Sequence, residues 1–155
     1  MMKIFRVLLF LIIPIAVGAI SGYFTTQSVQ SWYLTIDKPT WNPPNYVFGP
    51  VWTVLYLLMG YSSYRIFEQP ESKFRTIALR IYSFQLFLNF CWSFLFFYFN
   101  YTGVALLEIV ALWASILSMI VIFRKVDSLA AWLNIPYLLW VSFATALNAA
   151  IFYLN

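Results

Sequence analysis

The sequence predicts an all-α membrane protein: one domain, residues 1–155, built as a bundle of five transmembrane helices. Of its 155 residues, 63% are hydrophobic and only 9% are charged, whereas a soluble domain has about 25% charged residues. Such a chain cannot give itself a polar, water-facing surface, so its expected solvent is the lipid bilayer. Five apolar segments follow one another along the chain, each near the ~20 residues that cross the hydrocarbon layer as a helix.

Two scarce residue types limit the chemistry. The chain has one cysteine, Cys91, and no histidine. An intrachain disulfide is therefore impossible, and the commonest ligand of metals and haem iron, which is also the usual general base, is missing. We expect no metal site, no tightly bound cofactor and no conventional hydrolytic chemistry.

The first apolar segment, residues 4–25, is interrupted by Pro14 and by small residues. Two basic residues followed by an apolar run at 7–13 also fit a secretory signal peptide, which is the alternative to a first transmembrane helix. Gly18 and Gly22 form a small-xxx-small pattern, which lets a second helix approach closely and raises the hypothesis of a dimer contact.

Residues 26–46 form the only long connection. Pro43 and Pro44 near its end exclude a regular helix there. Its aromatic residues fit a belt at the membrane interface, but a connection this long is more typical of a lid or binding loop. We expect an outer lid that the two prolines hold rigid.

The second segment, residues 47–66, is expected to begin its helix near Pro50, because proline suits a first turn whose N–H groups are unpaired anyway. At helical spacing Trp52, Tyr56 and Met59 share one stripe. The stripe fits either ordinary helix packing or the wall of a cavity, with Trp52 pointing into it.

The third segment, residues 79–99, repeats polar residues every four positions: Gln85, Asn89 and Ser93. Amide side chains in hydrocarbon are costly unless paired, so this stripe must face the interior of the bundle. Two interpretations stay open: the amides tie helices together by hydrogen bonds, or they line a cavity and orient a polar group of a ligand.

The fourth segment, residues 104–123, follows a tight turn at 100–103, which makes it the antiparallel neighbour of the third. It carries Glu108, with Ala111 on the same face. A carboxylate at this depth of a membrane is a candidate for a functional site.

The fifth segment, residues 128–153, begins at Ser128, a suitable N-cap. Pro136 lies inside it and predicts a kink that leaves the Trp132 carbonyl free. One face of this segment carries Tyr137, Trp140, Ala144 and Asn148.

The basic residues predict the orientation in the cell membrane. With five helices and a cytoplasmic N-terminus, only Lys38 of the nine basic residues lies outside; the other eight, Lys3, Arg6, Arg65, Lys73, Arg75, Arg80, Arg124 and Lys125, lie inside. This asymmetry obeys the positive-inside rule. It predicts a multi-pass protein with the lid and the C-terminus outside, and it accounts for the net charge of +4 without a nucleic-acid partner.

The same topology brings four residues to related depths. Trp52 and Glu108 lie roughly 8 Å below the outer ends of their helices, and Asn89 and Trp140 roughly 15–20 Å below. Together with the lid, they predict an apolar, aromatic cavity with few polar groups. Such a cavity suits a flat hydrophobic ligand held by stacking and by one or two hydrogen bonds.

Three motifs resemble the translocator protein family, also called tryptophan-rich sensory proteins or peripheral-type benzodiazepine receptors, and look like a bacterial member of it. They are Trp41-x-Pro-Pro-x-x-x-Phe48-x-Pro50-x-Trp52, Gln85-Leu-x-Leu-Asn89-x-x-Trp92, and Pro136-Tyr137-Leu-x-Trp140-x-x-Phe143-Ala144-x-x-Leu147-Asn148. The motifs span nearly the whole chain. The resemblance implies that the first segment is retained as a helix rather than cleaved.

The resemblance also implies a five-helix bundle, commonly a homodimer, that binds porphyrins such as protoporphyrin IX and synthetic isoquinoline-carboxamide or benzodiazepine-type ligands. In bacterial relatives it implies light- and oxygen-dependent porphyrin breakdown, in which Trp52 and Trp140 would be the redox-active residues. The expected ligand contacts are Tyr33, Pro43, Trp52, Tyr56, Gln85, Asn89, Trp92, Glu108, Ala111, Trp140, Ala144, Leu147 and Asn148.

One departure from the family concerns sterols. Relatives that bind cholesterol carry an arginine or lysine after the tyrosine at the end of the last helix, whereas this chain ends Phe152-Tyr153-Leu154-Asn155. A cholesterol role is therefore not expected.

The sequence supports two functions. In the first, the excited state of a bound porphyrin supplies the reactivity, and the protein places the ring near oxidisable indoles. In the second, the same pocket serves a non-catalytic tetrapyrrole receptor, sensor or transporter; the chain shows no inverted repeat of the kind that secondary transporters use. A membrane scaffold with an incidental pocket is the third alternative.

Overall fold

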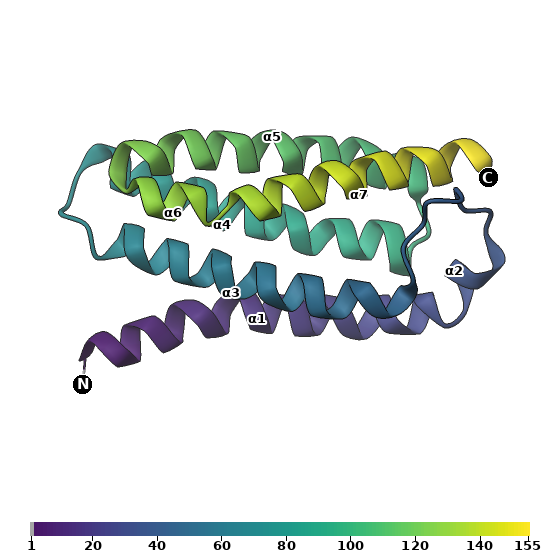
Figure 1. Cartoon of the computed structure of the whole chain (residues 1–155), viewed down its shortest axis with the longest axis horizontal. Helices are drawn as coiled ribbons and strands as arrows, with labels where there is room; N and C mark the ends of the chain where they lie inside the picture. The colour runs from purple at the N-terminus through teal and green to yellow at the C-terminus, as the bar shows by residue number, and fades with distance from the viewer. Residues whose placement is uncertain (1) are drawn as a thin grey trace.

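The computed structural model describes residues 2–155, which form long helices joined by short connections. Five long helical runs lie along one axis, and the two ends of the chain lie at opposite ends of the bundle (Figure 1). The runs are α1 (Met2–Val29), α3 (Phe48–Phe67), α4 (Lys73–Ser93), α5 (Thr102–Val126), and α6 (Ser128–Trp132) followed by α7 (Ile135–Leu154). The all-α prediction is confirmed for the described residues, which contain no strand.

Four of these runs are long and apolar enough to cross a membrane: α1, α4 with its continuation to Tyr98, α5, and α6 with α7. α3 is not among them although it has 20 residues. Its second half is diluted by Gly60, Ser62, Ser63 and Arg65. The fifth crossing therefore stays a prediction.

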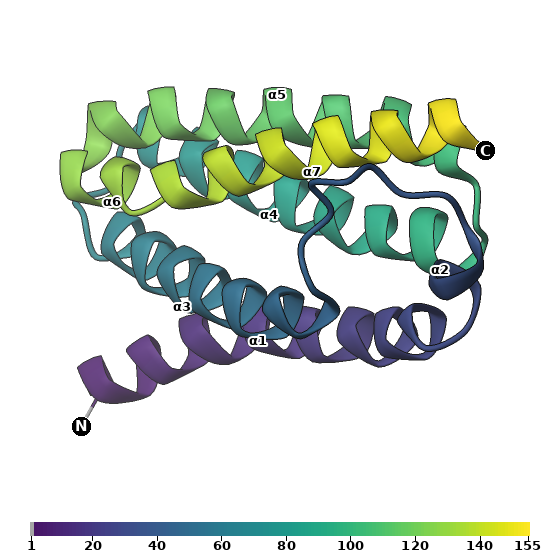
Figure 2. The same ribbon diagram turned by 45° about the vertical axis from the view of Figure 1, so that its right-hand side comes forward.

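The predicted lid is shorter than expected, because α1 continues to Val29 and a short helix, α2 (Trp32–Thr35), follows it. A 3-10 turn, η1 (Asn45–Val47), then leads directly into α3. Between α2 and η1 the chain crosses from the end of α7 to the start of α3 (Figure 2). The lid is therefore a strap across one end of the bundle.

Two other helices differ from the prediction. α4 begins at Lys73 rather than 79, because Ser72 caps it by accepting a hydrogen bond from the Arg75 N–H at 3.1 Å, and it ends in a π-helical turn, η2 (Phe94–Tyr98). The expected kink at Pro136 is a complete break between α6 and α7. Proline stands at the start of α7, where the N–H it lacks is not needed.

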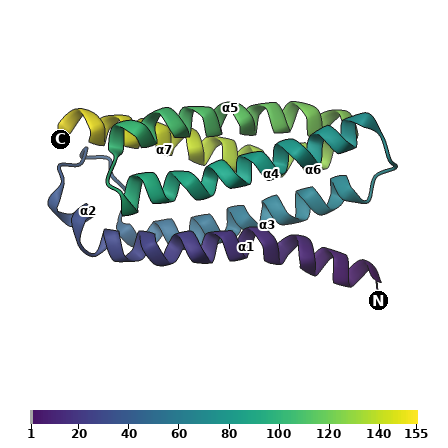
Figure 3. The same ribbon diagram turned by 180° about the vertical axis from the view of Figure 1, so that it is seen from behind.

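The helices pack in two groups. α1 lies along α3, while α5 packs against α4, α6 and α7 (Figures 1 and 3). Gly60 sets the spacing of α1 and α3, since a Cβ atom there would lie 2.6 Å from the Phe10 carbonyl oxygen. Only glycine permits this approach.

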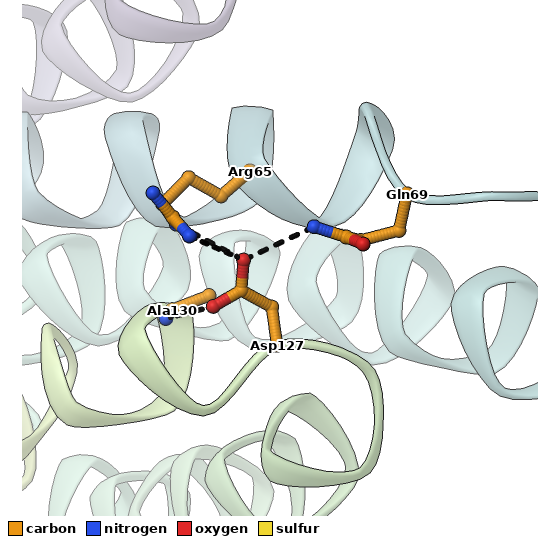
Figure 4. Close-up of polar contacts among 4 residues, drawn as sticks. All are labelled: Arg65, Gln69, Asp127 and Ala130. Atoms are coloured by element: carbon orange, nitrogen blue, oxygen red, sulfur yellow. Dashed lines mark hydrogen bonds and ion pairs between the residues drawn. The ribbon is translucent and has the colours of Figure 1, made fainter.

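One polar cluster ties the two groups together at the end opposite the lid. Asp127 accepts hydrogen bonds from Arg65 and Gln69, the first in α3 and the second just after it, and also from the Ala130 N–H at the start of α6 (Figure 4). The cluster fixes the far end of α3, so the lid end is the part of α3 that is free to form a site.

Candidate functional site

A cavity of about 770 Å³ lies under the lid, between α1, α3, η2 and α7. This volume falls within the ~300–1,000 Å³ typical of small-molecule sites. Its walls are strongly aromatic: Tyr33, Tyr46, Phe48, Trp52, Tyr56, Trp92, Phe96, Phe97, Trp140 and Phe143. An organic ring system would find flat surfaces on several sides.

Trp52 is fixed in the wall by its aromatic neighbours. Its ring stacks on Tyr56, one turn further along α3, with centroids 5.5 Å apart and an angle of 28°. The edge of Tyr137, from α7, approaches the same ring at 6.2 Å. Trp52 is therefore half-buried, and its aromatic neighbours fix the orientation of its indole in the cavity wall.

Trp140 stands in the α7 wall of the cavity. Its ring lies 6.2 Å from Phe48 and 5.6 Å from Phe143. Its indole N–H is buried and has no hydrogen-bond partner among residues 2–155. A buried unpaired donor is unfavourable, so this N–H adds nothing to the stability of the wall.

A hydrogen-bond chain runs behind Tyr56. The Tyr56 hydroxyl donates to Asn89 Oδ1 at 2.7 Å, and Asn89 Nδ2 donates to the Tyr137 hydroxyl at 3.1 Å. The Tyr137 hydroxyl in turn donates to Gln85 Oε1 at 2.9 Å. Neither Gln85 nor Asn89 lines the cavity. Of the two interpretations of these amides, the structure favours hydrogen bonds between helices.

Asn148 links the cavity wall to the start of α5. Its Oδ1 accepts a hydrogen bond from Trp92 Nε1 at 3.2 Å, and its Nδ2 donates to the Thr102 carbonyl at 2.8 Å. Asn148 and Trp92 both line the cavity. The pair fixes the orientation of the Trp92 ring.

The lid is held by its own polar contacts. The Tyr33 hydroxyl donates to Asn42 Oδ1 at 2.6 Å, and Lys38 Nζ donates to the Tyr33 and Ile36 carbonyls at 2.6 and 2.7 Å. Burial raises the pKa of Tyr33 to about 12, so its hydroxyl stays a donor at neutral pH. These bonds make the lid an ordered wall.

A second tie joins the lid to the end of α7. The Asp37 N–H donates to Asn155 Oδ1, and Asn155 Nδ2 donates to the Asp37 carbonyl, both at 3.0 Å. The reciprocal pair holds the strap across the cavity mouth.

The structure brings together most of the predicted contact residues. Eight line the cavity: Tyr33, Trp52, Tyr56, Trp92, Trp140, Ala144, Leu147 and Asn148. Five do not: Pro43, Gln85, Asn89, Glu108 and Ala111. As ligand contacts, all of them stay predictions.

Glu108 and Ala111 lie outside the cavity because α5 contributes no residue to its wall. The rise per residue predicts the depth of Glu108 along the bundle axis but not its direction around that axis. Both of its carboxylate oxygens are buried without a hydrogen-bond partner in the described part of the chain. Pro43 belongs to the lid but does not face the cavity.

The α1 wall was not predicted. It is made of small and polar residues, Gly18, Ala19, Ser21, Gly22, Thr25 and Thr26 among them. A Cβ atom at Gly18 would collide with the Tyr56 ring, whereas one at Gly22 would meet nothing within 4 Å. Gly18 thus lets Tyr56 of α3 approach α1 closely, as the small-residue pattern predicts, whereas Gly22 leaves open space beside the cavity; the dimer contact stays a hypothesis.

Within residues 2–155 no group of three histidine, cysteine, aspartate or glutamate side chains could hold a metal ion. Apolar membrane-length helices around an internal aromatic cavity define the class of the protein. It is a multi-pass helical membrane protein with a candidate small-molecule pocket.

Comparison with known proteins identifies the family. The TspO/MBR family model matches residues 10–154. The chain is 40% identical to the tryptophan-rich protein TspO of Archaeoglobus fulgidus, over 99% of each chain. It is 36% identical to the translocator protein of Sus scrofa (85% of this chain, 82% of the relative) and 34% identical to the tryptophan-rich sensory protein of Cereibacter sphaeroides (95% and 91%). The chain belongs to the TspO/MBR family, as its motifs predicted.

Proposed function

We propose that this protein binds a tetrapyrrole such as protoporphyrin IX in the cavity and promotes its light- and oxygen-dependent degradation. The observation that carries the proposal is the cavity itself: about 770 Å³ with three indoles, Trp52, Trp92 and Trp140, on walls from different helices. A flat macrocycle would stack on these rings. The same walls suit isoquinoline-carboxamide and benzodiazepine-type ligands.

The protein's contribution would be binding and positioning, because the porphyrin absorbs the light itself. An indole electron from Trp52 or Trp140 would reduce the excited porphyrin to its radical anion, and O2 would add to a ring carbon of that anion. The oxygenated ring would then return one electron to the indole radical cation, so that the net reaction is addition of O2 to the macrocycle and the tryptophan is regenerated.

The proposal includes the membrane arrangement. α3 is the fifth crossing, the N-terminus lies in the cytoplasm, and the lid and C-terminus face outward. The opposite positions of the two chain ends support an odd number of crossings (Figure 1). The assembly would be a homodimer.

Illumination of purified protein with protoporphyrin IX and oxygen tests this function. Absorption spectra in light and in darkness should show loss of the porphyrin bands only in light, faster with protein than without. Trp52→Phe and Trp140→Phe should slow the loss. Trp132→Phe is the matched control, because Trp132 is 67% exposed on α6 and does not line the cavity. Equal rates in all three variants would refute the roles of Trp52 and Trp140.

A non-catalytic receptor, sensor or transporter is the second candidate. It is favoured by the names of two relatives, a translocator protein and a tryptophan-rich sensory protein. In this case the aromatic walls only bind the ligand. Flux of porphyrin into proteoliposomes in the dark would favour transport, whereas dark binding without flux and without photodegradation would favour a sensor.

A further inference from the structure

A second hollow, a groove of about 580 Å³, lies between α3 and α7 on the outside of the bundle. Its eight lining residues include no charged, hydroxyl or amide side chain. Val54 of α3 and Leu139 of α7 line it and are 54% and 64% exposed. In a bilayer these residues face the acyl chains, so the groove is open to lipid.

The groove and the cavity share a wall. Trp140 and Phe143 line both of them. Their rings lie 5.6 Å apart, and each is buttressed by one further ring: Phe48 at 6.2 Å from Trp140, and Trp41 at 5.7 Å from Phe143. One layer of aromatic side chains therefore separates the cavity from the bilayer.

Little holds this wall closed. Among residues 2–155 no hydrogen bond or ion pair joins α3 to α7 directly. The two helices are linked through Asn89, which bonds to Tyr56 and Tyr137, and toward the far end Asn134 Nδ2 donates to Ser62 Oγ at 2.8 Å. α3 packs mainly on α1, and α7 mainly on α5. The Trp140 N–H is unpaired, so no polar contact fixes its rotamer. Rotation of the two rings breaks only apolar contacts.

The route through the lid is held more strongly. Opening it would break the Tyr33–Asn42 bond, the Lys38 bonds to backbone carbonyls and the reciprocal Asp37–Asn155 pair. A flat apolar ligand also partitions into the acyl region of the bilayer rather than into water. The higher concentration of the ligand in the bilayer and the lower energy barrier at the groove both favour entry through the groove rather than through the lid.

We propose that the α3–α7 groove is a lateral entrance through which the ligand reaches the cavity from the bilayer, with Trp140 and Phe143 as its gate. The inference rests on the proposed binding of a tetrapyrrole in the cavity. It predicts that groove residues outside the cavity control the rate of binding without controlling its affinity.

The test uses full-length protein in lipid nanodiscs and protoporphyrin IX in darkness. Association and dissociation rates are measured by stopped-flow quenching of tryptophan fluorescence, and the Kd by equilibrium titration. The double variant Val54→Phe/Leu139→Phe narrows the groove, and Leu139→Ala widens it. The matched control is Leu107→Phe/Val110→Phe on α5, whose residues are also lipid-exposed, at 76% and 52%.

The narrowed groove should slow association and dissociation together by about tenfold, which corresponds to roughly 1.4 kcal/mol in the barrier, at unchanged Kd. Leu139→Ala should speed both rates, and the control should match the wild type. Equal rates in all proteins, or a changed Kd with unchanged association, would overturn the entrance while leaving the cavity's function intact. Absence of binding to the wild type would overturn both.

Discussion

Asp127 is predicted to hold the end of the bundle opposite the lid, and Asp127→Asn tests this. Its Oδ2 accepts from Arg65 Nε at 3.0 Å, Arg65 Nη2 at 2.8 Å and Gln69 Nε2 at 3.1 Å, and its Oδ1 accepts from the Ala130 N–H at 3.0 Å. Asparagine is nearly the same size as aspartate and can still cap α6, but it carries no negative charge.

The magnitude follows from the burial of the pair. Removing one partner of a buried ion pair costs about 3–5 kcal/mol. The Asp127 side chain is only 6% exposed, but that of Arg65 is 31% exposed and can regain water. We therefore expect a loss of about 2–3 kcal/mol in the free energy of unfolding. At about 2–4 °C per kcal/mol for a chain of this length, the Tm should fall by roughly 4–12 °C.

The pH dependence gives a second signature. Burial alone would raise the pKa of Asp127, but the Ala130 N–H and the Arg65 guanidinium outweigh it and lower the pKa below its usual value. A lowered carboxyl pKa contributes stability that is present above the unfolded value of about 3.9 and is lost as the pH falls through the folded pKa. The wild type should therefore lose stability below about pH 4, and Asp127→Asn should lack this component.

The assay is thermal unfolding in detergent between pH 3 and pH 8. Asp127→Ala, which removes the cap as well, should lower the free energy of unfolding by about a further 1 kcal/mol. An Asp127→Asn protein with the Tm and acid profile of the wild type would refute the reasoning.

Three further outcomes follow from the packing. Gly60→Ala should lower the free energy of unfolding, measured by thermal denaturation, by about 1–3 kcal/mol, because the new Cβ meets the α1 backbone. Gly22→Ala, whose Cβ lies in open space, should be neutral or up to about 1 kcal/mol stabilising. Equal effects of the two substitutions would contradict this explanation. Asn89→Ala removes the hydrogen bonds from Asn89 to the Tyr56 and Tyr137 hydroxyls and should lower the free energy of unfolding by about 1–3 kcal/mol. Because Trp52 stacks on Tyr56, its fluorescence emission should shift as well. Unchanged emission would show that the position of Trp52 does not depend on these hydrogen bonds. Asn155→Ala should change the unfolding free energy by less than about 1 kcal/mol yet raise hydrogen exchange in residues 36–44; an unchanged exchange rate there would show that the lid does not depend on this tie.

The sequence was sufficient to predict the helices and much of the cavity. Apolar segments of membrane length predict helices directly, and the period of 3.6 residues places Trp52 above Tyr56 and Trp140 above Ala144. Depth along a helix follows from the rise per residue. Direction around the bundle does not, and for this reason Glu108 was grouped with a cavity that α5 never reaches.

The role of the small residues in α1 is harder to predict from sequence. Gly18 is in close contact with Tyr56, and Gly22 has open space beside it. A pattern of small side chains predicts close approach equally well for a neighbouring helix, a second copy or a ligand. Similarly, Gln85 and Asn89 had to be paired, but only the structure shows that the partners are Tyr56 and Tyr137. Pro136 predicts an interruption of the last helix, but only the structure shows that the interruption separates α6 from α7 beside Asn134, whose Nδ2 donates to Ser62 Oγ.

Equilibrium titration of protoporphyrin IX in darkness tests the central claim, that the cavity under the lid is the tetrapyrrole site. Gly22→Trp places a large side chain in the cavity from a position with no neighbour within 4 Å, and Ala111→Trp is the control on the outer face of α5. The account predicts binding to the wild type and to Ala111→Trp with equal Kd, and at least about tenfold weaker binding to Gly22→Trp, or ~1.4 kcal/mol. Equal affinity in all three proteins would contradict it.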